Sequence, residues 1–294
     1  MATGLSLSST SNLSSGQRIV VAAAKTAFEP SAPDPDLVSN ERIGQGEKQW
    51  DILTYARLSD ASTLSEGVDL AQSEQLVTAS TSITPSEHGI IATLSNRLVR
   101  RQGDSNVVAT TGTMIGESLR RRMAKDVINL YDGFSNGVSA AGSALDITTF
   151  RGGTAFLMTD NDSGFGPAQP PFHACLHIEQ ISDVIADMTD ASPRGTTSGI
   201  TDEFLQRWWK ASDRLYGTSI FHSGNIERDS GDDAKGTMKV EDALHLVMAN
   251  EVEATEQPDH SLRAVEYGVF QEWGEAERAD PHGIEIFTDA AATL

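Results

Sequence analysis

The chain has 294 residues, enough for one large domain or two smaller ones with their own hydrophobic cores. Its formal net charge of −20 argues against free-standing binding to a nucleic-acid backbone, because phosphate recognition depends on basic side chains. Cys175 is the only cysteine, which excludes an intramolecular disulfide and a multi-cysteine zinc site and favours a reducing compartment.

The first residues do not show the charged start and apolar segment that are typical of a signal peptide. No apolar run approaches the roughly 18 residues of a membrane span, so we expect a soluble protein that is not exported. Residues 1–28 are rich in Ser and Thr and predict a flexible arm. Three prolines within 29–35 predict a linker that cannot be helical, because each proline removes a donor and extends its predecessor.

Two strand patterns follow. Apolar residues alternate over 50–58, and 76–84 is β-branched and stops at Pro85. The polar stretch between them, with Glu66 and Gly67 near its middle, is longer than an ordinary hairpin turn. Two strands with so little core are not stable alone, so we expect this flap to contact another subunit. A mobile surface loop is the alternative.

A long amphipathic helix is predicted next. Ser105 or Asn106 can cap it, and one apolar face continues to Gly137. Some 28 residues would make a rod of about 40 Å. Residues 97–125 hold seven basic and two acidic residues, whereas the rest of the chain is strongly acidic. The basic run predicts either a solvated helix face or a contact with a subunit or polyanion; its arginines are Arg97, Arg100, Arg101, Arg120, Arg121 and Arg122.

The second half alternates shorter elements. Strands are predicted at 172–177, 219–221, 262–273 and 283–288, and helices at 178–188, 241–250 and from Thr201 onward. Helices and strands are interleaved without a βαβ repeat, which favours an α+β fold.

Catalytic motifs are absent from the sequence: there is no phosphate-binding loop, dinucleotide fingerprint, nucleophile elbow or His-Glu-x-x-His helix. The best chemical candidate is His173, Cys175 and His177, which share one face of a predicted strand and could ligate zinc beside Glu179. Alternate strand residues lie nearly 7 Å apart, however, so three in a row rarely converge on one ion. We expect a packed or half-exposed strand face, with no cofactor, no metal and no enzyme activity.

Several segments, taken in order, carry a family resemblance. They are 64–69, 84–90 leading into 94–99, the helix end at 124–133, 172–183, 215–221 and the closing 282–290. With these segments, over about residues 45–294, the chain resembles a tailed-phage major capsid protein of the Hong Kong 97 fold.

The resemblance implies a domain plan: an N-terminal arm (1–48), an extended β-hairpin loop (49–85), a peripheral domain with a long spine helix (86–145 and 252–294) and an axial domain (146–251). It implies a structural protein that assembles into hexamers and pentamers, forming an icosahedral shell around phage genomic DNA. Glu66, Gly67, Arg100, Arg101, Arg120, Arg121 and Arg122 would then be assembly or genome-facing residues. The expected location is the virion capsid, assembled in the host bacterial cytoplasm.

Partners follow from the same resemblance. We expect copies of the chain itself, packaged double-stranded DNA bound non-specifically, a portal and in some cases decoration proteins, and no membrane. Some relatives cross-link flap lysines, but residues 51–84 contain no lysine. Others carry a scaffolding segment before the arm, which is absent here, so a separate scaffold protein is expected. Two alternatives stay open: an encapsulin-like cellular nanocompartment shell, and a zinc-dependent hydrolase using His173, Cys175 and His177.

Overall fold

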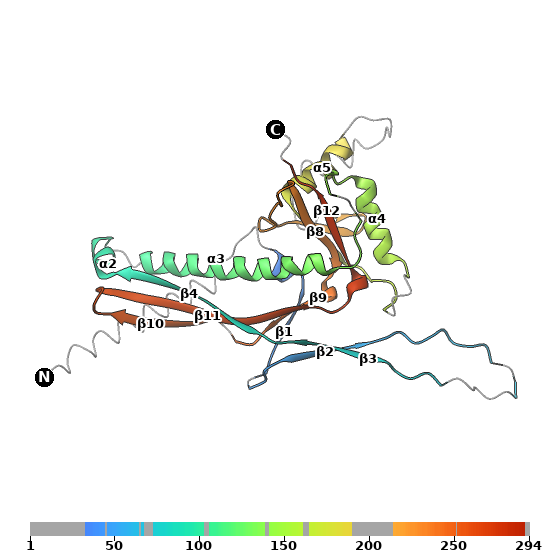
Figure 1. The fold of residues 1–294 in the computed structure, drawn as a ribbon, viewed down its shortest axis with the longest axis horizontal. Helices are drawn as coiled ribbons and strands as arrows, with labels where there is room; N and C mark the ends of the chain where they lie inside the picture. Colours follow the sequence, from blue (N-terminus) through green and yellow to red (C-terminus); the bar gives the residue numbers. More distant parts are fainter. Residues whose placement is uncertain are drawn as a thin grey trace.

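Two β-sheets, a long helix and a projecting ribbon make up the fold of this computed structural model (Figure 1). The structure describes residues 33–44, 46–64, 66–67, 73–102, 106–138, 141–160, 165–189, 214–250 and 252–291. The predicted arm at 1–28 and the predicted helix from Thr201 lie outside the described residues.

The long sheet runs along the longest axis of the molecule (Figure 1). Its order is β1-β9-β11-β10, and β4 pairs with the opposite edge of β11. Its strands are β1 (Ser39–Arg42), β4 (Ser86–Ser95), β9 (Leu244–Met248), β10 (Glu253–Asp259) and β11 (Ala264–Glu277). β1 pairs with β9 in parallel, and the other pairs are antiparallel.

The predicted long helix is present as α3 (Asn106–Asn129), and it continues as a 3-10 turn, η2 (Leu130–Gly133). The short helix α2 (Asn96–Gln102) precedes it. α3 buries Ile115, Leu119 and Met123 in one core with Val269 and Trp273 of β11. The indole of Trp273 donates to Asp126 at 3.1 Å, so the helix face and the sheet are joined by packing and by a buried hydrogen bond. No described helix is long and apolar enough to cross a membrane.

The second sheet stands upright beside one end of α3 (Figure 1). Its order is β12-β8-β5-β7-β6. The strands are β5 (Phe172–Leu176), β6 (Arg214–Leu215), β7 (Thr218–His222), β8 (Asp233–Val240) and β12 (Gly283–Asp289). Helices α4 (Ile147–Met158) and α5 (Ile178–Thr189) accompany this sheet. Asp146 caps α4 by accepting from the Thr149 amide at 2.5 Å, and Phe150 and Leu157 of α4 join the core of the sheet.

Both strands of the flap are confirmed. β2 (Trp50–Tyr55) and β3 (Thr78–Ile83) pair antiparallel from Trp50 opposite Ile83 to Tyr55 opposite Thr78. They form a two-stranded sheet of their own that extends away from both larger sheets (Figure 1).

Two predictions about local structure are wrong. Residues 241–250 do not form a helix: η3 (Glu241–Ala243) leads directly into β9, which is buried between β1 and β11. A short apolar run fits a buried strand as well as a helix, and sheet pairing decides here. The predicted linker 29–35 ends in a 3-10 helix, η1 (Asp34–Asp36), in which Asp34 and Pro35 are buried.

The strands also cross the predicted domain boundaries. β9 falls within the range predicted as axial, but it pairs with β11 in the long sheet. β12 falls within the range predicted as peripheral, but it pairs with β8 in the upright sheet. The end of the chain therefore contributes a strand to each of the two sheets.

A carboxyl pair beside the end of α3 makes folding sensitive to pH. Burial, together with repulsion and a hydrogen bond from the nearby Asp280 carboxyl, raises the pKa of Glu277 from 4.5 to about 7. The folded chain then holds a proton that the unfolded chain has released, so this group lowers stability progressively as the pH rises from about 4.5 to about 7.

Replacing Glu277 with glutamine should remove this part of the pH dependence. We expect E277Q to be more stable than the wild type at about pH 8, and the difference to shrink towards about pH 5. Urea midpoints at both pH values measure it, with the exposed Glu253→Gln as control. A constant difference between E277Q and wild type across this range would contradict the assignment.

Candidate assembly surfaces

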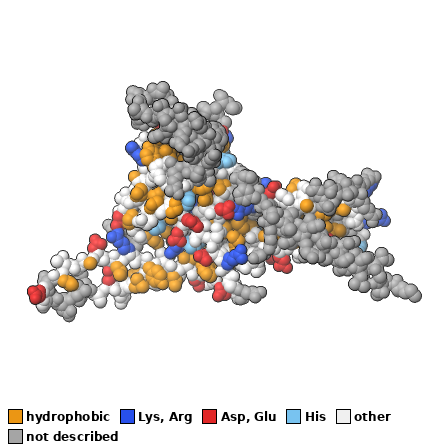
Figure 2. Space-filling model, turned by 180° about the vertical axis from the view of Figure 1, so that it is seen from behind, with side chains coloured by type: hydrophobic (Ala, Val, Ile, Leu, Met, Phe, Trp, Pro, Cys, Tyr) orange, Lys and Arg blue, Asp and Glu red, His pale blue; other side chains and the backbone are white. Residues whose placement is uncertain are grey.

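The flap exposes large apolar side chains along its length, and Figure 2 shows hydrophobic groups on the projecting ribbon. Side chains with more than half of their surface exposed are Leu53, Tyr55, Leu58, Leu64, Leu76 and Val77. Apolar surface in water is unfavourable, and contiguous exposed patches mark interaction sites. The flap is therefore a candidate surface for contact with another protein chain.

The flap is rooted in the body at its base. Ile52 and Ile83 are buried with Val247 of β9 in a small core cluster. Gly274 of β11 allows this approach, since a Cβ built there would lie 2.8 Å from the Ile83 Cγ2 atom. Alternate residues of β2 are exposed, so one face of the strand packs on the long sheet and the other is open.

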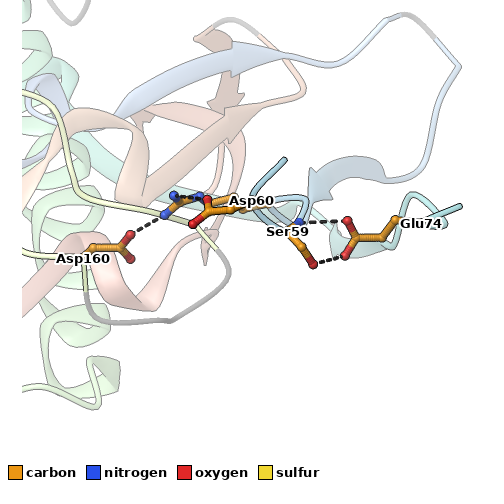
Figure 3. Close-up of polar contacts among 5 residues, drawn as sticks. Ser59, Asp60, Glu74 and Asp160 are labelled. Carbon is orange, nitrogen blue, oxygen red and sulfur yellow. Dashed lines mark hydrogen bonds and ion pairs between the residues drawn. The ribbon is translucent and has the colours of Figure 1, made fainter. Parts of the chain in front are cut away.

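A second attachment lies farther out on the flap (Figure 3). Arg57, beyond β2, forms an ion pair with Asp160, which follows α4, and its guanidinium also lies 3.6 Å from Asp60. Farther along, the Ser59 amide donates to Glu74 at 2.9 Å, which ties the outgoing and returning segments together beyond the paired strands. No local sequence pattern predicts these contacts, because their partners lie far apart in the chain.

The predicted tip residues are exposed, as a contact surface requires. Glu66 and Gly67 lie in a turn, and Gly67 has a φ of +80°, a backbone conformation that favours glycine. Whether the tip contacts another subunit remains a prediction.

The predicted arginines whose side chains the structure describes differ in their contacts. Arg120 pairs with Asp36 of η1, and Arg122 pairs with Asp126 at 3.0 Å on its own helix. Arg121 is exposed. Arg100 and Arg101 lie in α2, but their side chains are outside the description. Arg120 thus joins the N-terminal segment to α3, and the genome-facing role of the group stays a prediction.

The structure does not bring His173, Cys175 and His177 together as a zinc site. Cys175 is fully buried, His173 is half-buried with its ring 5.7 Å from that of Phe221, and His177 lies beyond the end of β5. The Nδ1 atom of His177 accepts from the Glu179 amide at 3.2 Å. In the part of the chain that the structure describes, no group of three or more His, Cys, Asp or Glu could hold a metal ion.

A shallow pocket of about 380 Å³ lies between α3 and the upright sheet. Its charged lining consists of Arg122, Lys125, Arg228, Lys235, Asp132, Glu227, Asp229 and Asp233. Lys125 pairs with Glu227 and Lys235 pairs with Asp132 across it. Four basic and four acidic groups give this lining a formal charge of zero.

A buried polar cluster fixes the N-terminal segment where the two sheets meet. Asp34 accepts from the Tyr131 hydroxyl at 2.8 Å and from the Ser223 hydroxyl at 2.5 Å. Lys239 of β8 donates to the Leu37 carbonyl. Burial raises the pKa of Asp34 and lowers that of Lys239 to about 8. Burial also raises the pKa of the adjacent Cys175 thiol, which disfavours the reactive thiolate form.

This cluster was missed because Asp34 stands between two prolines in a sequence typical of a linker. The partners come from η2, β8 and the segment after β7, all roughly 100 residues or more away. No local pattern signals such pairing.

Comparison with known proteins identifies similar folds among solved structures, whereas the comparisons by sequence find no match. No protein-family model and no curated protein sequence matches the chain. Solved structures do match. A chain from the capsid of Ralstonia phage GP4 is similar with a TM-score of 0.68 at 10% identity, covering 88% of both chains.

Two further structures agree with it. A chain from the head of Helicobacter pylori bacteriophage KHP40 gives a TM-score of 0.67 at 10% identity, covering 87% of this chain and 89% of the other. A chain from the capsid of a native GTA particle gives 0.66 at 12% identity, covering 90% of this chain and 92% of the other. In all three comparisons the likeness covers 87–90% of this chain. The chain has the Hong Kong 97-type fold of tailed-phage capsid proteins.

Proposed function

We propose that this protein is a major capsid protein that assembles into hexamers and pentamers of an icosahedral shell enclosing phage double-stranded DNA. The observation that carries the proposal is the apolar flap projecting from a chain whose fold matches capsid chains over about 90% of its length. A protruding ribbon that exposes Leu53, Tyr55 and Val77 gains stability only when another surface covers it. A neighbouring copy of the chain supplies that surface. When the same contact repeats around a rotation axis, the copies form a closed ring.

The role is structural rather than enzymatic. Support comes from the likeness to capsid structures. In this proposal the protein resides in the virion capsid, assembles in the host cytoplasm, and works with a separate scaffold protein, a portal and in some systems decoration proteins. The domain plan is kept, with β9 assigned to the peripheral domain and β12 to the axial domain because of their sheet pairing.

Electron microscopy of the expressed chain, alone and with candidate scaffold proteins, tests the proposal. We expect hexameric rings or closed particles, and we expect assembly to increase with salt from about 0.05 M to about 0.5 M because like-charged subunits repel less when screened. Dispersed monomers under every condition would contradict a shell role.

Nucleic acid inside purified particles separates a virion shell from a nanocompartment with the same fold. Particles from infected or induced cells should contain nuclease-protected double-stranded DNA. Particles that contain a protein cargo and no DNA would support the nanocompartment instead.

A further inference from the structure

We propose that Arg57 is a positioning residue for the flap: its ion pair with Asp160 sets the direction in which the flap leaves the subunit, and this second attachment is weakened by salt. The consequence for assembly rests on the proposed function. The geometry itself belongs to the single chain.

Arg57 stands out electrostatically within the flap. Residues 49–85 contain five acidic residues and one basic residue, a net charge of −4, and Arg57 is that basic residue. Its partner Asp160 is 103 residues away in sequence, just after α4. The contact therefore joins the flap to the upright sheet with its helices α4 and α5, together called the upright domain below. An otherwise acidic ribbon beside an acidic chain would be repelled, and this arginine provides the attraction.

Arg57 also lies beside Gly166, close to Asp160 in the chain. Gly166 has a φ of +75°, and a Cβ built there would make ordinary van der Waals contact, at 3.8 Å, with both Cδ and Nη1 of Arg57. The Gly166 carbonyl in turn lies 3.3 Å from the Nε2 atom of His282 in η4 (Asp280–His282), and the ring of Phe165 packs edge-on against His282. The segment that meets Arg57 is thus held to the upright domain.

A flap that is attached to the body at two points has a fixed direction, whereas a flap attached only at its base can rotate about that base. The base of the flap is fixed by Ile52 and Ile83 in the long sheet. Arg57 lies five residues beyond Ile52, about 16 Å along an extended chain. There it pairs with Asp160 of the upright domain. Without the second contact, the ribbon beyond β2 and β3 can swing about its base.

The Arg57–Asp160 ion pair favours one direction of the flap, and salt can weaken this preference. Arg57 and Asp160 keep 47% and 43% of their side-chain surface exposed. Exposed ion pairs are screened by salt and shift an equilibrium only a few-fold. Flap direction should therefore depend on ionic strength.

Distance measurements by electron spin resonance on the unassembled subunit test the proposal. Spin labels are attached at Leu64→Cys on the flap and Thr148→Cys on α4, both exposed positions, while the native Cys175 is buried and left unlabelled. In Asp160→Asn the ratio of docked to undocked flap should fall about two- to five-fold. Raising salt from about 0.05 M to about 1 M should move the wild type in the same direction and leave D160N nearly unchanged.

Asp60→Asn is the matched control, because it removes the other carboxylate beside Arg57 without touching the upright domain. It should leave the distance distribution as in the wild type, and the charge-reversed pair Arg57→Asp with Asp160→Arg should restore docking. Identical distributions in the wild type and D160N, or an equal change in D60N, would overturn the proposal. Because the subunit is not assembled, this outcome is independent of whether the chain forms shells.

Discussion

Replacing Asp34 with alanine is expected to lower the free energy of unfolding by about 3 to 5 kcal/mol, because it leaves buried polar groups without their partner. Tyr131 and Ser223 lose the carboxylate to which they donate, and Lys239 loses a nearby opposite charge in a fully buried position. Urea unfolding followed by tryptophan fluorescence measures the change, since Trp273 lies in the core that includes Tyr131.

Asp36→Ala provides the control for Asp34→Ala. Asp36 lies two residues away in the same 3-10 turn, but it is exposed and pairs with Arg120 near the surface. Its loss should cost no more than about 1 kcal/mol. Equal effects of the two substitutions would mean that the turn itself, and not the buried cluster, holds the N-terminal segment.

Making the flap polar should abolish shells without unfolding the subunit. The triple variant Leu53→Thr, Tyr55→Thr and Val77→Thr removes three exposed apolar side chains and keeps β-branched residues in the ribbon. If each side chain contributes about 1 kcal/mol or more when a neighbour covers it, the association constant falls by roughly two to three orders of magnitude. Electron microscopy scores the particles, and urea unfolding should show unchanged subunit stability.

The matched control changes the facing strand without changing its polarity. Ser80 and Thr78 lie opposite Leu53 and Tyr55, so Ser80→Thr with Thr78→Ser alters the same surface conservatively. This variant should assemble as the wild type does. Normal shells from the polar triple variant would show that the apolar flap surface is not an assembly contact.

The two results address separate parts of the molecule. The Asp34 cluster lies where α3, the upright sheet and the N-terminal segment meet, whereas the flap lies outside both sheets. Contributions from sites that share no partners add in general. A variant that combines Asp34→Ala with the polar flap should therefore show the stability loss of the first and the assembly loss of the second.

The sequence by itself determined the elements whose signal is local. β2 and β3 follow from alternation and β-branched content, and α3 follows from one apolar face kept over 24 residues. The order of the segments was enough to predict the capsid fold, and the exposed tip at Glu66 and Gly67 followed from polarity and a glycine.

Only the tertiary structure decided the features that depend on distant partners. Residues 244–248 are a strand because β1 and β11 pair with them on both edges, and Asp34 is buried because Tyr131 and Ser223 satisfy it. Arg57 meets Asp160 because the flap leaves its base alongside the upright domain. Periodicity records which face of an element is buried, but the choice of a hydrogen-bond or charge partner depends on how the elements pack, which no short window of sequence contains.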